Sequence, residues 1–169
     1  MFVIGATKKL QNELNYPIQD IEKYQHVSDI YKWHANIVTL QNKKCLILFN
    51  DATGLNLTLF GLETPQFEHF DSVIKGSLRQ LFQLLGIDKS LEEELLKADK
   101  EIVYTKTSSR KILGMMTEIK TIIEYTIENK NYDQIDAVEV NEHNNKELIF
   151  NSLKHQTPYE TFINYINEK

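Results

Sequence analysis

The hydrophobic positions of residues 37–61 follow the patterns typical of β-strands. The segment 37–40 is rich in β-branched residues, and 45–49 is a continuous apolar run that suits a central strand. The polar residues 41–44 between them predict a turn, so the two segments indicate a hairpin. Over residues 55–61 leucines stand at alternate positions, which is the period of a half-buried strand. We therefore expect an antiparallel meander of three strands.

The remainder of the chain carries the repeat of three and four residues that is typical of amphipathic helices. The longest apolar stripe covers residues 67–85 and follows the helix-start signal Thr64-Pro65. A second stripe predicts a helix over residues 110–128, with caps supplied by residues 107–109. The other expected elements are a strand at 1–4, a helix capped by Thr7, a loop with a helical turn at 21–31, a helix opened by a capping box of Ser90 and Glu93, strands at 101–107 and 137–140, a mobile loop at 141–145, and a final helix opened by Thr157-Pro158. These elements predict one α+β domain over residues 1–169, in which an antiparallel β-meander or sheet packs against several amphipathic helices.

Composition agrees with a globular domain and narrows the partners that we expect. Hydrophobic residues make up 41% of the 169 residues and charged residues 25%. The net charge is −5, and the acidity is concentrated after residue 50, so broad binding to nucleic-acid phosphates is disfavoured. The single cysteine, Cys45, indicates a reducing compartment, and the longest apolar run, Cys45–Phe49, is far too short to span a bilayer. We expect a cytoplasmic protein that does not enter a membrane.

The sequence carries no familiar catalytic or metal-binding motif. The five histidines, at positions 26, 34, 69, 143 and 155, show no ligand spacing, and Cys45 lies within an apolar strand. We therefore expect no catalytic residue, no metal and no cofactor. Enzymatic activity stays open, with its absence favoured.

One group of residues could hold an anion. Lys106, Ser108, Ser109 and Arg110 lie where a predicted strand passes into a predicted helix, so amide donors, hydroxyls and two cations meet there. The remaining candidate members of this site are Lys9, Asn50 and Asp51. Serine is also the usual residue of an ordinary helix cap, and the sequence leaves both interpretations open.

Trp33 directly precedes the strongest strand signals and is the only tryptophan in the chain. We predict that its ring is buried against a helix stripe. The alternative is a partner-binding surface made by Trp33 and His34, because tryptophan is enriched at the centres of protein interfaces.

Four segments resemble a bacterial family of small proteins that is described only as a domain of unknown function and occurs in chromosomes and mobile elements. The segments are ATKKL at 6–10, WHAN at 33–36, KKCLILFN at 43–50 and KTSSRKILG at 106–114. The resemblance covers nearly the whole chain and implies a shared fold and a shared surface around Lys9, Trp33, Asn50 and Arg110. It brings no established activity. This chain departs from the family at 115–118, where Met-Met-Thr-Glu replaces Ser-Met-Asn-Asp.

These observations predict a non-enzymatic regulatory or mobile-element protein that binds a macromolecule, with another protein as the expected partner. One form of this hypothesis is an acidic inhibitor of a nucleic-acid-handling host or defence enzyme, because an acidic surface is complementary to a basic partner. The alternative is a sensor or enzyme for a small phosphorylated ligand or nucleotide, with its anion site near residue 108. The sequence leaves the oligomeric state open.

Overall fold

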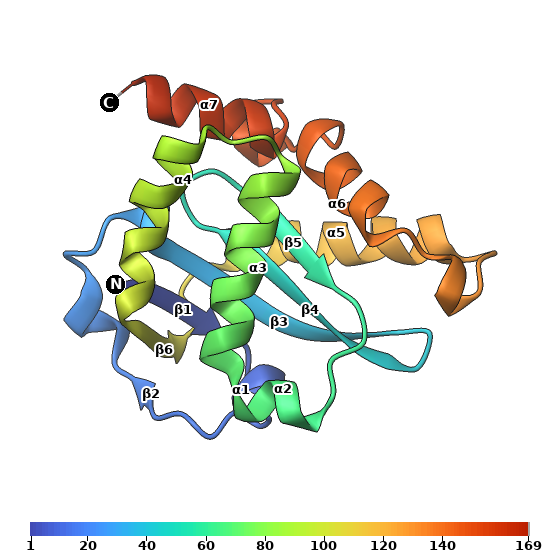
Figure 1. Cartoon of the computed structure of the whole chain (residues 1–169), viewed down its shortest axis with the longest axis horizontal. Coiled ribbons are helices and arrows are strands. Elements are labelled where there is room, and N and C mark those ends of the chain that lie inside the picture. The colour runs from blue at the N-terminus through green and yellow to red at the C-terminus, as the bar shows by residue number, and fades with distance from the viewer. Residues whose placement is uncertain (169) are drawn as a thin grey trace.

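A mixed sheet of six strands forms the centre of the protein, with helices on both of its faces (Figure 1). The computed structural model describes residues 1–168. The strand order is β2-β6-β1-β3-β4-β5. The strands are β1 (Phe2–Ala6), β2 (Ile18–Gln19), β3 (Lys32–Leu40), β4 (Lys43–Asn50), β5 (Asn56–Leu59) and β6 (Ile102–Lys106). The α+β class expected from the sequence is confirmed.

The predicted antiparallel meander is formed by β3, β4 and β5. In the β3–β4 hairpin Trp33 lies opposite Asn50 and Leu40 lies opposite Lys43. The loop consists of Gln41 and Asn42, with φ values of 49° and 64°, as a two-residue type I′ turn requires. The other half of the sheet is parallel, because β1 pairs in parallel with β3 and β6, and β6 pairs in parallel with β2. This parallel half was not expected from the sequence.

The helices divide between two hydrophobic clusters, one on each face of the sheet. The α-helices are α1 (Lys8–Gln11), α2 (Thr64–Glu68), α3 (Phe70–Leu84), α4 (Lys89–Leu96), α5 (Arg110–Ile127), α6 (Ala137–Lys146) and α7 (Pro158–Asn167), and five short 3-10 helices lie between them at residues 21–24, 29–31, 97–100, 132–134 and 151–153. The large buried hydrophobic side chains of α1, α3, α4 and α7, such as Leu10, Leu78, Leu95 and Phe162, belong to the first cluster, and those of α5 belong to the second. In Figure 1, α3 and α4 accordingly lie in front of the sheet and α5 behind it. No helix within residues 1–168 combines the length and the apolar character that crossing a membrane requires.

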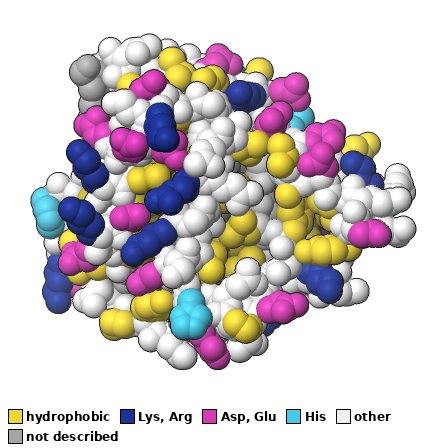
Figure 2. Space-filling model, in the orientation of Figure 1, with side chains coloured by type: hydrophobic (Ala, Val, Ile, Leu, Met, Phe, Trp, Pro, Cys, Tyr) yellow, Lys and Arg dark blue, Asp and Glu magenta, His cyan; other side chains and the backbone are white. Residues whose placement is uncertain are grey.

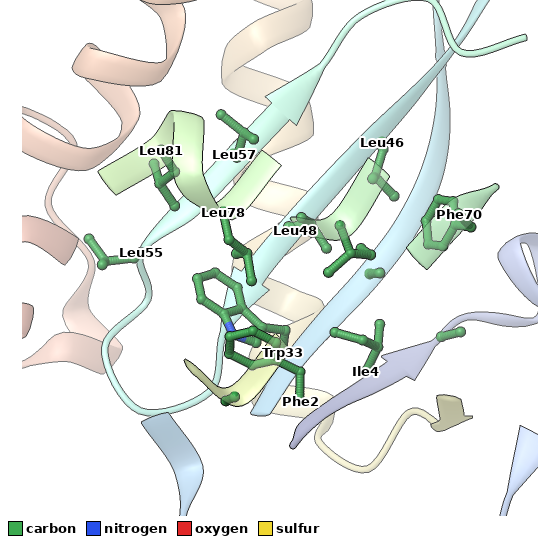
Figure 3. Close-up of a cluster of buried hydrophobic side chains, with 14 of the residues drawn as sticks. Phe2, Ile4, Trp33, Leu46, Leu48, Leu55, Leu57, Phe70, Leu78 and Leu81 are labelled. Carbon is green, nitrogen blue, oxygen red and sulfur yellow. The ribbon is translucent and has the colours of Figure 1, made fainter. Parts of the chain in front are cut away.

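The first cluster contains Trp33, as predicted. Its side chain is 2% exposed and lies in the cluster with Phe2 from β1 and Leu78 from α3 (Figure 3). His34, the next residue, is 1% exposed. Because both side chains are buried, neither is available as the surface anchor considered from the sequence.

One predicted helix is interrupted, and the starts of two helices, α2 and α4, differ from the prediction. The single helix expected over residues 67–85 is interrupted at His69, whose φ of −120° and ψ of 44° separate α2 from α3. Helix α2 begins with a capping box of Glu63 and Gln66 rather than with Thr64 as its cap. Helix α4 is capped by the side chain of Asp88, which accepts a hydrogen bond from the N–H of Leu91, rather than by Ser90.

The strand expected at 137–140 and the mobile loop expected at 141–145 are both wrong, because these residues form the single helix α6. Asp136 caps this helix by accepting a hydrogen bond from the N–H of Glu139. The two valines at 138 and 140 gave the strand signal, but only Val140 is buried. The loop was expected from three asparagines, Asn141, Asn144 and Asn145, and all three residues are buried against the sheet.

Candidate functional site

His34 connects the residue that follows β4, Asp51, with the loop before α5. Its Nδ1 lies 2.7 Å from Oδ1 of Asp51, and its Nε2 accepts a hydrogen bond of 3.2 Å from the backbone N–H of Ser108. Because a backbone N–H can only donate, Nε2 carries no proton and Nδ1–H donates to the carboxylate. Both ring nitrogens are therefore engaged, and His34 has a positioning role: it ties the end of β4 to the loop before α5.

Asp51 lines a cleft of about 550 Å³, which we call the junction cleft. Its walls are the end of β4, the first turns of α5, the segment 152–156 and α7. The charged lining residues are Asp51, Lys111, Lys154 and Glu168. The volume lies within the range of small-molecule sites. The arrangement offers both positive and negative groups to a small ligand.

The structure brings together only part of the anion site expected from the sequence. Asp51 and Ser109 both line the junction cleft. The hydroxyl of Ser109 also accepts a hydrogen bond from the N–H of Ile112, so Ser109 acts as the cap of α5. Lys106, Ser108 and Arg110 are exposed and do not belong to the cleft lining.

Asn50 and Lys9 lie outside this cleft. Asn50 is 1% exposed; its Oδ1 accepts hydrogen bonds from the N–H groups of Ala52 and Thr53, and its Nδ2 donates to the carbonyl of Ile30. It organises the loop after β4. Lys9 belongs to α1, whose Leu10 packs in the first cluster, whereas α5 packs in the second, on the other face of the sheet. Of the residues grouped from the sequence, only Asp51 and Ser109 line the junction cleft.

A second concave surface lies between α5 and α6, and we call it the acidic groove. Its volume is about 460 Å³, and four carboxylates line it, from Asp136, Glu139, Glu142 and Glu147. Its cationic lining residues are Lys130 and Lys146. Acidic side chains are visible over α6 at the upper right of Figure 2. This groove was not predicted from the sequence, because helix α6 was not. The spacing of three and four between residues 136, 139, 143 and 147 was the available signal for that helix.

Two lining side chains of the acidic groove, Lys146 and His143, have partners of their own nearby. The ammonium of Lys146 lies 4.9 Å from the ring centroid of Tyr159 in α7, a cation–π contact. Nε2 of His143 lies 3.8 Å from a carboxylate oxygen of Glu147. The groove therefore retains an excess of negative charge.

Buried amides hold α6 against the edge of the sheet. Asn145 and Asn141 pair with the backbone of Asn56 and Thr58 in β5. Nδ2 of Asn56 also donates to the carbonyl of Asn144. One wall of the acidic groove is thereby fixed to the central sheet.

Neither concave surface offers the ligands of a metal centre. Within residues 1–168 no group of three or more His, Cys, Asp or Glu side chains is arranged to hold a metal ion. The thiol of Cys45 is buried in the second cluster, and burial raises its pKa, which disfavours the reactive thiolate. The chemistry that the geometry supports is the binding of charged groups.

Comparisons with known proteins give a family match and a distant structural neighbour. Residues 3–161 match the family described as "Domain of unknown function (DUF6933)". Curated proteins give no match. One similar solved chain is described as "Structure of the HTLV-2 integrase catalytic core domain in complex with magnesium (trimeric form)"; it is 10% identical, covers 76% of this chain and 93% of its own, and has a TM-score of 0.45. A similarity this distant carries no information on activity.

Proposed function

The chain belongs to the DUF6933 family of domains of unknown function, and we propose that it is a non-enzymatic binding protein whose acidic groove receives a basic segment of a partner protein. The observation that carries the proposal is the excess of carboxylates over ammonium groups in a groove of about 460 Å³. Charge complementarity of this kind selects partners and accelerates their encounter.

The walls of the groove suit the long side chains of lysine and arginine. Ile123 from α5 and Val140 from α6 lie behind the groove and are only 0% and 8% exposed, so the surface of the groove is made mainly by the carboxylates and the other polar lining residues. A lysine or arginine side chain packs its methylene stem on apolar surface while its cationic head remains among polar groups. The carboxylates of the groove therefore match the cationic head of a basic side chain.

The distribution of charge elsewhere supports this choice of surface. Over α3 and α4, Figure 2 shows lysines and carboxylates interspersed, whereas acidic side chains predominate over α6. A partner with a basic segment has less reason to bind a surface of mixed charge. The proposal therefore places the contact on α6 and the second half of α5.

The kind of partner that we propose is a nucleic-acid-handling enzyme of a host or a defence system, which the protein would inhibit. Enzymes that bind nucleic acid present lysine and arginine to its phosphates, and a protein of net charge −5 is complementary to them. Bacterial origin, a mobile-element context and a cytoplasmic location are parts of the same proposal. The free, buried Cys45 is in keeping with a reducing compartment.

Titration with a labelled arginine-rich peptide, followed by fluorescence anisotropy at low salt, tests the proposed groove. The wild-type protein should bind, and the double variant Glu139→Gln, Glu142→Gln should bind more weakly. Exposed ion pairs contribute about 0.2–1 kcal/mol each, so we expect Kd to rise by about 2- to 30-fold.

The matched control is the double variant Glu93→Gln, Glu94→Gln, which removes the same charge from exposed positions in α4. Its affinity should stay close to that of the wild type. An equal loss of affinity in both double variants would show diffuse attraction rather than a groove, and the absence of peptide binding at low salt would reject the proposal.

A further inference from the structure

The junction cleft is separate from the acidic groove and shares no lining residue with it. Its charged lining consists of two lysines, Lys111 and Lys154, and two carboxylates, Asp51 and Glu168. The lining is thus balanced in charge, and both signs face a space of about 550 Å³. A simple anion would meet the two carboxylates, and a simple cation would meet the two ammonium groups. Only a ligand with both charges matches the whole lining.

The carboxylate of Asp51 is held in place by groups behind the cleft wall. Its side chain is 13% exposed, and one oxygen accepts the Nδ1–H of His34, whose own side chain is 2% exposed. The backbone N–H of Ser108 fixes the far side of the imidazole. A carboxylate oriented in this way loses little freedom when a ligand binds, which favours affinity.

The segment that supplies Lys154 is also held in an unusual conformation. Lys154 and His155 have φ values of 57° and 59°, in the left-handed region that non-glycine residues rarely adopt. The segment is closed by the bridge between Phe150 and Gln156. Leu153 packs against Gly54, where an added Cβ would lie 2.7 Å from a Leu153 methyl carbon. Tertiary packing therefore fixes the backbone of Lys154 at the cleft.

We infer that the junction cleft binds a small zwitterionic ligand, a molecule that carries an ammonium group at one end and a carboxylate or phosphate at the other. The ammonium pairs with Asp51 and the anionic end pairs with Lys111. Ala52 and Leu153 contribute apolar lining to the same cleft and contact the body of the ligand. This inference is independent of the proposed function, because the two surfaces use different residues.

The test is an NMR titration of the ¹⁵N-labelled protein with four probes at equal concentration. Alanyl-alanine and phosphoethanolamine are zwitterions that differ in their anionic group, and inorganic phosphate and ethanolamine are the two halves of the second probe. At least one zwitterion should give saturable shifts at the amides of the cleft, and neither half should do so. The choice between the two zwitterions identifies the anionic group.

Two variants examine the two ends of the cleft separately. Asp51→Asn keeps an oxygen to accept the His34 hydrogen bond but loses the charge, and Lys111→Gln removes an exposed cation. Asp51→Asn removes a charge that is mostly buried and should weaken the binding of the zwitterion at least tenfold, whereas Lys111→Gln removes an exposed charge and should weaken it about two- to fivefold. The matched control Asp133→Asn, exposed and outside the cleft, should bind within twofold of the wild type.

Three results would overturn the inference. The first is the absence of saturable shifts with both zwitterions. The second is saturable binding of inorganic phosphate with an affinity equal to that of phosphoethanolamine. The third is unchanged affinity in Lys111→Gln or in a folded Asp51→Asn variant, with folding judged from its amide spectrum.

Discussion

The side-chain amide of Asn145 pairs with both backbone polar groups of Asn56: its Oδ1 accepts the N–H at 2.9 Å and its Nδ2 donates to the carbonyl at 2.8 Å. Asn141 repeats this pairing with Thr58, at 2.8 and 3.0 Å. Four residues of helix rise about 6 Å, close to the roughly 6.7 Å between alternate residues of a strand. The two amides therefore occupy the places that a neighbouring strand would take at the edge of β5.

Replacing Asn145 with alanine should destabilise the protein strongly. The N–H and the carbonyl of the buried Asn56 would both lose their partner, at about 1–3 kcal/mol for each unsatisfied group. We expect the free energy of unfolding, measured in urea, to fall by about 2–6 kcal/mol. The exposed Asn129, changed to alanine, should stay within about 0.5 kcal/mol of the wild type. Equal free energies of unfolding for the two variants would show that the pairing of Asn145 with Asn56 does not stabilise the fold.

The proton of His34 should reside on Nδ1. Long-range ¹H–¹⁵N NMR spectra should show a protonated Nδ1 and a bare Nε2, because Nε2 accepts the N–H of Ser108. The Ser108 amide should exchange about fivefold faster in His34→Phe, which corresponds to a net hydrogen bond of about 1 kcal/mol. Asp51→Asn should leave that exchange rate near the wild-type value. A proton found on Nε2 would contradict the arrangement.

Stability should decrease as the pH rises above 10, and Tyr104 should account for part of the decrease. Burial, followed by the hydrogen bond to Asp71, raises the pKa of Tyr104 above the ordinary 10.0 of a tyrosine. The folded protein therefore retains a proton that the unfolded chain releases near that pH. The contribution of Tyr104 is complete below pH 10 and is lost as the pH increases further, by up to about 1.4 kcal/mol per pH unit.

Urea unfolding at a series of pH values measures this dependence. Tyr104→Phe should give a flatter dependence above pH 10, because its ring has no proton to release. Identical slopes for the variant and the wild type would show that other groups cause the whole effect.

Trp33→Ala should lower the free energy of unfolding by about 3–5 kcal/mol, since the side chain is 2% exposed within the first cluster. Trp33→Phe should cost less, because most of the apolar volume is retained. As the only tryptophan, Trp33 should give a blue-shifted emission in the native protein that iodide quenches poorly. A red-shifted and readily quenched emission would place the ring at the surface.

Elements with strong local signals could be predicted from the sequence. The hairpin around Gln41 and Asn42, the helix α5 behind Ser109 and the helix α7 behind Thr157 depend on neighbouring residues, and each was found. Helix α6 was missed because its asparagines contact β5 across more than 80 positions of sequence, as Thr58 and Asn141 do with a separation of 83. Without knowledge of these distant partners, a cluster of asparagines is typical of a loop.

The residues of the candidate sites could likewise be predicted only where a local sequence pattern marks them. Asp51 and Ser109 were selected from their places beside predicted strand and helix ends, and both line the junction cleft. Lys154 and Glu168 come from the last segments of the chain, and no local pattern relates them to Asp51. Only the packing of α7 and segment 152–156 beside the end of β4 brings these charges together.

The central position of β1 in the sheet has a consequence for biosynthesis. Phe2 pairs with Ile102 on one side of β1, and Val3 pairs with Lys32 on the other. On the ribosome, the meander of β3, β4 and β5 can form from residues 32–59, whereas β1 has a bare edge until β6 has been made. During this interval the apolar segment Phe2–Ile4 is open to pairing with other nascent chains. A general chaperone that shields the N-terminal strand would therefore be needed most while the middle third of the chain is being synthesised.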